Sequence, residues 1–167
     1  MDYKKYLRGT GTLTHAGISI SAGANFTLKL EPVVDAAPDT EQNRDPLGFV
    51  IKRRGMSIEC DNFDITPDMV RMLTGYNNAN SVTPGAHRID FDEAQTDLLE
   101  GETVLVGALV DQTPITIQFK RGVAVPPGQS IVVSGKEYGG SKLTFVKCHP
   151  TDGTQISGYW QIGTVPV

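Results

Sequence analysis

The sequence predicts a mainly β protein, a β-sandwich or barrel of about ten short strands flanked by one short α-helix. Apolar and polar residues alternate in many short segments, and period two is typical of a strand with one buried face. The 18 glycines and 10 prolines fit the tight turns that such strands need. Only one segment combines helical spacing with capping residues. The length of 167 residues suits a single domain, which we place at residues 10–167.

The alternating segments follow one another along most of the chain. In "NFTLKL", Phe26, Leu28 and Leu30 fall on one face, and Thr27 and Lys29 fall on the other. The other predicted strands are "GISIS" (17–21), "FVIKR" (49–53), "MSIEC" (56–60), "HRIDFD" (87–92), "ETVLVGALV" (102–110), "ITIQF" (115–119), "VAV" (123–125), "SIVVS" (130–134), "SKLTFVKC" (141–148) and "SGYWQIGTV" (157–165).

The helix is predicted in "FDITPDMVRMLTG". Thr66 can cap it, Pro67 suits the first helical position, and Asp68 places a negative charge at the positive end of the dipole. Gly75 is predicted to end the helix in a left-handed conformation. So short a helix must pack against a sheet, and we expect it to plug an open end of the sandwich or barrel. The residues predicted to pack it are Ile65, Met69, Val70 and Leu73.

Two segments lack an apolar period. Residues 1–9 are polar and basic, and are predicted to form a flexible arm. Residues 31–48, "EPVVDAAPDTEQNRDPLG", contain three prolines and mostly acidic or polar side chains, and are predicted to form a long loop. A loop of this length inside a compact domain usually has a function of its own. Shorter polar loops are predicted at residues 76–85 and 134–142.

No pattern in the sequence indicates catalysis, a metal or a cofactor. The three histidines stand far apart, and the two cysteines, Cys60 and Cys148, are expected to fill the core as free thiols. Asp90 and Asp92 match the first two ligands of an EF-hand loop, but Gln95 and Gly101 occupy two positions that calcium binding needs. The protein is therefore predicted not to be an enzyme. A net charge of −4 also argues against a dedicated nucleic-acid binder.

Neither a secretory signal nor a membrane anchor is expected. The stretch "MDYKKYLRGTG" lacks the apolar run of a signal peptide, and no stretch is apolar enough to span a bilayer as a helix. We therefore expect a protein that is made in the cytoplasm. What remains is a structural or interaction protein.

The strand "MSIECDNFDIT" that leads directly into "PDMVRMLTG" resembles a segment of the tail tube (major tail) proteins of long-tailed bacteriophages. In that family an alternating strand ends at a Thr-Pro turn with an acidic residue, and one short helix follows that ends in a motif similar to L-x-G. The similarity extends in order and length over most of the chain from about Thr10. It includes a long loop before the helix, a later strand pair that leads to the turn "PPGQ", the polar loop "SGKEYGGSK" and a closing strand.

This resemblance implies two orthogonally packed sheets or a barrel, flanked by a helix. Subunits of the family form hexameric rings whose sheets join edge to edge around a channel, and the rings stack into a tube for genome ejection. The implied location is the virion tail. The implied partners are further copies of this chain, the tape measure, the baseplate or tip, the terminator and, in a contractile tail, a sheath. DNA would pass transiently through the lumen without sequence-specific binding. No cofactor is implied.

The physics of assembly agrees with these expectations. Pairing across subunits removes exposed strand edges, and ring stacking is a heterologous contact that builds filaments. A flexible loop and arm can order on assembly. We therefore predict contacts between subunits at charged residues of residues 1–9 and 31–48, namely Lys4, Lys5, Arg8, Glu31, Asp35, Asp39, Glu41, Arg44 and Asp45.

Two other functions remain open at this point. The first is a head decoration or tail-completion protein of the virion, because such proteins are also rich in β-strands. The second is a carbohydrate-binding β-sandwich. Such a site needs an exposed aromatic platform, whereas Tyr159 and Trp160 alternate, so only one of them is expected to face solvent.

Overall fold

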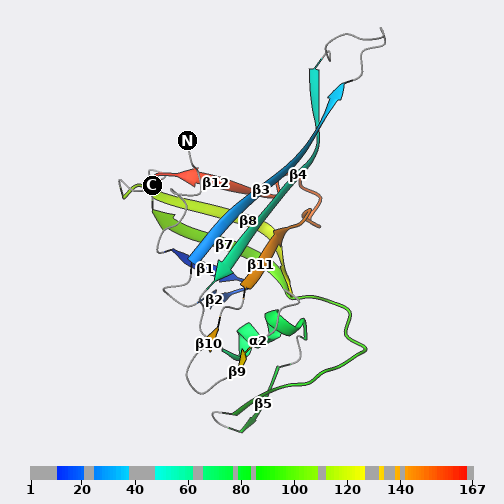
Figure 1. The fold of residues 1–167 in the computed structure, drawn as a ribbon, viewed down its shortest axis with the longest axis vertical. Helices are drawn as coiled ribbons and strands as arrows, with labels where there is room; N and C mark the ends of the chain where they lie inside the picture. Colours follow the sequence, from blue (N-terminus) through cyan, green and yellow to red (C-terminus); the bar gives the residue numbers. More distant parts are fainter. Residues whose placement is uncertain are drawn as a thin grey trace.

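The chain folds as a mainly β protein in a computed structural model, which confirms the predicted fold class (Figure 1). All strand pairs in the described residues are antiparallel. The structure describes residues 11–20, 25–37, 48–61, 66–76, 79–83, 86–108, 112–126, 132–133, 138–139 and 142–164.

Eight strands form one sheet in the order β2-β1-β7-β8-β11-β4-β3, and β12 pairs with β8 beside β11. Two small hairpins, β5 with β6 and β9 with β10, lie outside this sheet. The strands of the large sheet are β1 (Thr12–His15), β2 (Ile18–Ile20), β3 (Asn25–Ala37), β4 (Gly48–Asp61), β7 (Glu100–Ala108), β8 (Pro114–Val125), β11 (Lys142–Lys147) and β12 (Gly158–Ile162). The strands of the hairpins are β5 (Ala79–Thr83), β6 (Ala86–Ile89), β9 (Val132–Val133) and β10 (Tyr138–Gly139).

The hydrophobic core lies on one face of the large sheet. Strand register aligns Leu13 with Leu105 and Leu105 with Ile117, so their side chains project from the same face. In the other half of the sheet, Phe145 lies opposite Ile58. The buried apolar residues are Leu13, Ile20, Phe26, Ile58, Cys60, Met69, Met72, Leu73, Leu105, Ile115, Ile117, Phe119, Ala124, Leu143 and Phe145.

The sheet curls so that its two halves pack against each other. The ring centroids of His15 on β1 and Phe145 on β11 are 4.8 Å apart, although β7 and β8 separate these strands in the sheet. Near the start of β1, a Cβ at Gly11 would lie 3.5 Å from the ring of Phe26 on β3. The two layers of the predicted sandwich or barrel are therefore halves of one hydrogen-bonded sheet.

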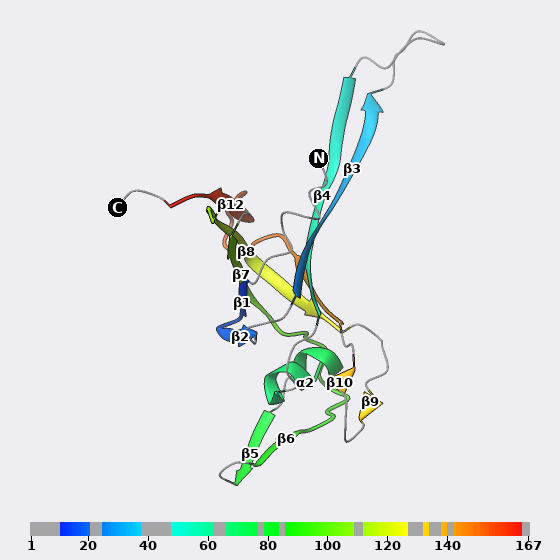
Figure 2. The ribbon, with the colours of Figure 1, turned by 60° about the vertical axis from the view of Figure 1, so that its left-hand side comes forward.

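Helix α2 (Pro67–Thr74) begins and ends as the sequence predicts. The Thr66 hydroxyl accepts a hydrogen bond from the Met69 amide at 3.3 Å, and Gly75 has φ 78° in the left-handed region. The helix buries Met69 and Leu73, as predicted, and also Met72. Val70 is only half-buried, and Ile65 lies outside the described residues. The helix lies at one end of the molecule, beyond the edge of the large sheet (Figure 2).

Replacing Thr66 with alanine is expected to lower the free energy of unfolding by about 1 kcal/mol, because the Met69 amide loses its partner. Urea denaturation followed by circular dichroism measures this loss. Thr66→Ser keeps the accepting hydroxyl and should remain within about 0.5 kcal/mol of the original protein. Equal losses in the two variants would show that the cap does not stabilise the helix.

The predicted loop over residues 31–48 is wrong for its first seven residues, because Glu31–Ala37 continue β3. Gly48 already begins β4, and "FVIKR" and "MSIEC" belong to that one strand. Backbone pairing with β4 continues the strand beyond the core, although a two-stranded ribbon gains little stability on its own. Pro32 is tolerated because β3 is an edge strand. Residues 38–47 and the predicted arm over residues 1–9 lie outside the described residues.

Two of the shorter predicted loops are also partly strand. The polar segment 76–85 contains β5, and the polar segment 134–142 contains β10 and the first residue of β11. Each of these strands pairs with a neighbour, and β5 and β10 do so in small hairpins outside the large sheet.

Candidate assembly surfaces

The far half of the β3–β4 hairpin projects from the body of the molecule as a long two-stranded ribbon (Figure 1, Figure 2). We call residues 30–37 of β3 and 48–56 of β4 the β-arm. Its strands pair in register from Leu30 opposite Met56 to Ala37 opposite Gly48. In both views, no other element of the described residues lies beside the far part of the β-arm.

The apolar face of the β-arm is a continuation of the core face of the sheet. Along β3, Phe26 is 1% exposed, whereas Leu30, four residues further on the same face, is 57% exposed. Further out, Val34 lies opposite Ile51 on this face, and both are about half exposed. Phe49, two residues from Ile51, is 71% exposed. The hydrophobic pattern therefore persists where the core of the monomer has ended.

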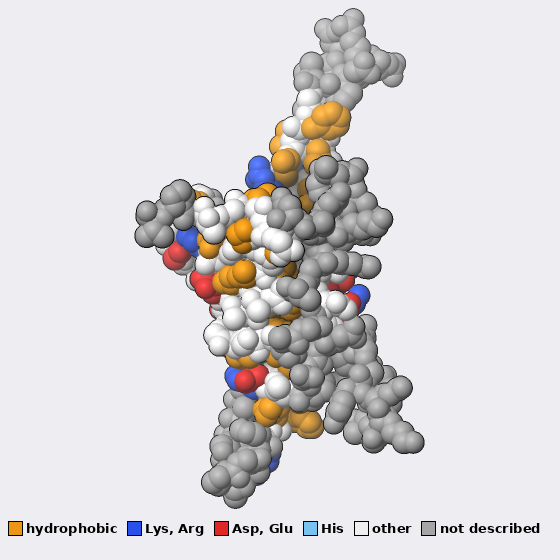
Figure 3. Space-filling model, turned by 90° about the vertical axis from the view of Figure 1, so that its left-hand side faces the viewer, with side chains coloured by type: hydrophobic (Ala, Val, Ile, Leu, Met, Phe, Trp, Pro, Cys, Tyr) orange, Lys and Arg blue, Asp and Glu red, His pale blue; other side chains and the backbone are white. Residues whose placement is uncertain are grey.

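The opposite face of the β-arm carries apolar side chains as well. A β-bulge between Val33 and Val34 leaves Lys52 as the extra residue of β4. Val33 and Val50 project from the face opposite to Val34, and both are exposed. Hydrophobic side chains are visible along the exposed part of the β-arm in Figure 3. A ribbon that is apolar on both faces is suited to insertion between two surfaces.

An apolar ribbon of this kind is uncommon on a monomer. Soluble monomers rarely leave contiguous apolar patches uncovered, and long apolar edge strands promote pairing with other chains. Burial of one large apolar side chain contributes about 1.5–3 kcal/mol. The exposed apolar side chains of the β-arm are Leu30, Val33, Val34, Phe49, Val50 and Ile51.

The base of the β-arm is fixed to the sheet by charged side chains. Glu59 on β4 forms ion pairs with Lys29 on β3 and with Lys142 on β11, the latter at 3.2 Å. Burial alone would raise the pKa of Glu59, but hydrogen bonds from the two ammonium groups outweigh burial and hold the pKa below its usual value. The three neighbouring strands β3, β4 and β11 are thereby joined where the β-arm leaves the body.

The sheet also has open edges at β2, β3 and β12. On β12, Tyr159 is 48% exposed and Trp160 is 41% exposed, so the prediction that only one of them faces solvent is wrong. The reason is that β12 is an edge strand. Trp160 lies on the core side of β12, but other residues cover its side chain only in part. The two rings still project from opposite faces of the strand and do not form one platform.

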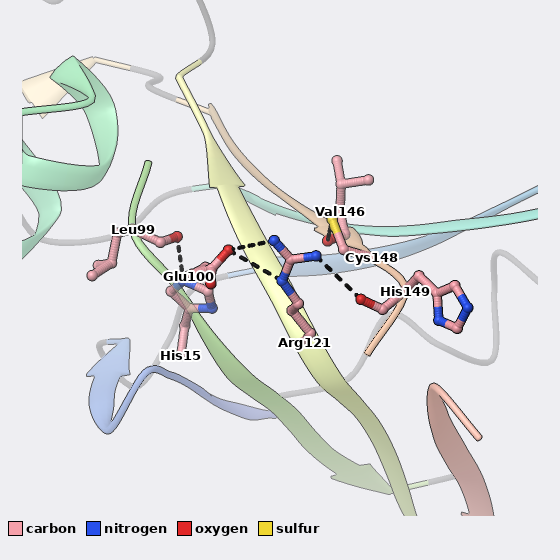
Figure 4. A network of polar contacts seen from close by, with 7 residues as sticks. All are labelled: His15, Leu99, Glu100, Arg121, Val146, Cys148 and His149. Atoms are coloured by element: carbon pink, nitrogen blue, oxygen red, sulfur yellow. Dashed lines mark hydrogen bonds and ion pairs between the residues drawn. The ribbon is translucent and has the colours of Figure 1, made fainter. Parts of the chain in front are cut away.

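His15 is a buried polar residue of the core. Its Nε2–H donates to the Leu99 carbonyl at 3.1 Å (Figure 4). The Thr103 hydroxyl donates to Nδ1 at 2.7 Å. This pairing matches a neutral ring with its proton on Nε2. Burial lowers the pKa of His15 below 6.5, and the hydrogen bond to Leu99 opposes this effect only in part.

We expect this histidine to make the protein less stable in mild acid. Because the pKa of His15 is lower in the folded state, the unfolded chain binds more protons below about pH 6.5. The contribution of His15 to the free energy of unfolding is complete above that pH. It declines as the pH falls, by at most about 1.4 kcal/mol per pH unit. Urea denaturation at several pH values between about 7.5 and 5.5 measures the slope of the free energy of unfolding against pH.

His149 provides the matched control, because its side chain is exposed. The slope should persist in His149→Gln and should be smaller in His15→Gln. An equal slope in all three proteins would show that another group causes the pH dependence.

Polar contacts near the start of β7 are structural. Arg121 donates from Nε and Nη2 to Glu100 Oε2 at 3.1 and 2.8 Å, and from Nη1 to the His149 carbonyl at 3.1 Å (Figure 4). These bonds join β8 to β7 and to the segment after β11.

Burial raises the pKa of the Cys60 thiol to about 12, so this thiol stays protonated and unreactive at neutral pH.

The described residues contain no group of three His, Cys, Asp or Glu side chains that could hold a metal ion. Both cysteines are free thiols, Cys60 buried and Cys148 half-buried. No helix in the described part of the chain is long and apolar enough to cross a membrane.

The residues predicted to contact other subunits are only partly covered by the structure. Glu31 and Asp35 both lie on the β-arm, where Asp35 forms an ion pair with Lys52. All of these predicted contacts are charged residues, whereas large apolar side chains are exposed along the β-arm. A signal was present, because "FVI" at residues 49–51 is a short apolar run beside a segment taken for a loop. The predicted contacts Lys4, Lys5, Arg8, Asp39, Glu41, Arg44 and Asp45 lie outside the described residues.

Comparisons with family models, curated proteins and solved structures found no match for this chain. We therefore infer the function from the geometry of the β-arm and of the sheet edges.

Proposed function

We propose that this protein is a structural subunit of the tail tube of a long-tailed bacteriophage, which forms hexameric rings that stack around a channel for genome ejection. The observation that carries the proposal is the β-arm, whose apolar face continues the core and stays uncovered in the monomer. Such an arm becomes stable when a neighbouring subunit covers it.

The arrangement of the body supports the same proposal. The open edges β2, β3 and β12 can pair with edges of neighbouring subunits, which removes unpaired backbone groups. The β-arm and helix α2 lie at opposite ends of the molecule (Figure 1). A contact between the β-arm of one subunit and the body of the next would therefore repeat in one direction. A repeated heterologous contact builds a filament or a stack of rings. The order of strand, capped helix and later strands also agrees with the resemblance to the tube family.

A head decoration or tail-completion protein could use the same β-arm to attach to the virion. The difference lies in the assembly, because such a protein binds a fixed number of sites, whereas a tube subunit polymerises. A carbohydrate-binding module is less well supported, because Tyr159 and Trp160 project from opposite faces of β12.

Sedimentation velocity over a wide range of protein concentrations tests the proposal. We expect subunits of 18.0 kDa to form rings of six and then larger particles as the concentration rises. A monomer that does not change with concentration, or a complex that forms only with a separate virion protein, would rule out the tube.

A further inference from the structure

A basic groove lies at the base of the β-arm, between β4, β11 and the segment that follows β11. Its volume is about 440 Å³. Lys52, Arg53 and Arg54 of β4 line one side, and Lys147 of β11 lines the other. Met56 and Val146 add apolar surface to the lining.

The positive charge of this groove is only partly compensated. Glu31 is the one carboxylate among the described residues that line it, and Lys52 forms an ion pair with Asp35. Within the described residues, no carboxylate forms an ion pair with Arg53, Arg54 or Lys147. Clustered cations on a concave surface attract a negatively charged partner.

A negatively charged surface lies near the other end of the molecule, beside helix α2. The acidic turn, residues 90–93, has the sequence Asp-Phe-Asp-Glu and follows β6. Tyr76, which follows α2, donates a hydrogen bond to Glu93 at 2.8 Å, and its ring lies 5.0 Å from the ring of Phe91. Phe91 is nevertheless 68% exposed. The turn thus presents an aromatic side chain among carboxylates.

The shape of the acidic turn is fixed by short-range hydrogen bonds. The Asp92 carboxylate accepts from the Ala94 amide at 3.0 Å, and the Asp92 carbonyl accepts from the Gln95 amide at 3.0 Å. Arg88, at the start of this region, forms an ion pair with Asp90. A turn that already holds its conformation loses little entropy on binding.

We propose that the acidic turn of one subunit docks in the basic groove of a second copy of this chain. This inference rests on the proposed function, because it names the surfaces that hold successive subunits together. The carboxylates of Asp92 and Glu93 meet the cations of the groove, and the exposed ring of Phe91 packs against Met56 in its lining. Because groove and turn lie at separate places along the molecule, the contact is heterologous and repeats head to tail.

A charge exchange tests this contact. One variant carries Arg53→Glu and Arg54→Glu, which gives it a negative groove and a negative turn. The other carries Asp92→Lys and Glu93→Lys, which gives it a positive groove and a positive turn. Each variant alone should need at least about tenfold more protein to associate, because its groove and turn repel. An equimolar mixture should associate at nearly the original concentration, because both surfaces then find an opposite charge.

The controls separate this inference from the proposed function. Lys120→Glu reverses an exposed charge on β8 outside the groove and should associate as the original protein does. Thermal unfolding confirms that every variant is folded. If the original protein assembles and the groove variant assembles equally well, the docking inference is wrong and the tube proposal stands. Failure of the mixture to restore assembly also overturns the inference, and groove-dependent binding of a duplex oligonucleotide would then identify nucleic acid as the occupant. If the original protein never associates, both proposals are wrong.

Discussion

Replacement of Phe49 and Ile51 with aspartate is expected to abolish self-assembly and to leave the monomer folded. Both side chains lie on the β-arm with large exposed fractions, so the monomer gains little stability from them. In an assembly, burial of the two side chains contributes about 1.5–3 kcal/mol each, and buried carboxylates in their place would cost further free energy. The concentration needed for assembly should therefore rise by at least about a hundredfold. Sedimentation velocity and thermal unfolding measure the two effects.

Conservative replacements at the same positions provide the matched control. Phe49→Leu with Ile51→Val keeps both side chains apolar and should preserve assembly. If the aspartate variant assembles at the original concentration, the β-arm is not an assembly surface.

Replacement of Phe145 with alanine is expected to lower the free energy of unfolding by about 3–5 kcal/mol. Phe145 is fully buried on β11, opposite Ile58 of β4 and Ala124 of β8, and it packs against the ring of His15. Its side chain therefore joins the two halves of the curled sheet, and its removal leaves a cavity between them. Urea denaturation at protein concentrations too low for self-assembly measures this decrease in the free energy of unfolding.

Phe49→Ala removes the same atoms from an exposed position. Its effect on the unfolding of the monomer should stay within about 0.5 kcal/mol, because Phe49 is 71% exposed. Similar losses at Phe145 and Phe49 would contradict the division of the sheet into a core half and an uncovered arm.

Much of the fold could be predicted from local patterns. Alternation placed Phe26 and Leu28 on the inner face of a strand, and Ile58 and Cys60 on the inner face of another, as the structure has them. The caps at Thr66 and Gly75 located the helix, because capping depends on a few neighbouring residues. The burial of Met72 was missed, since it depends on how the helix sits against other elements.

The extent of the β-arm could not be predicted in the same way. Glu31–Ala37 contain a proline and acidic residues, which are typical of a loop, yet backbone pairing with β4 extends the strand. Pairing between two strands is a property of both, and the sequence of one of them does not reveal it.

The candidate assembly surfaces depend even more on tertiary structure. Lys147 lines the same groove as Arg53 and Arg54 because β11 pairs with β4, although about ninety residues separate them in the chain. The exposure of Phe49 depends on where the curled sheet stops covering the hairpin. Hydrophobicity alone would place this side chain in the core.

Electron cryomicroscopy of the purified protein at high concentration would show whether the subunits assemble into a tube through the β-arm. We expect hollow tubes built of stacked six-subunit rings, with the β-arm of each subunit covered by a neighbouring subunit. A protein that remains monomeric, or particles in which the β-arm stays exposed to solvent, would rule out the tube proposal.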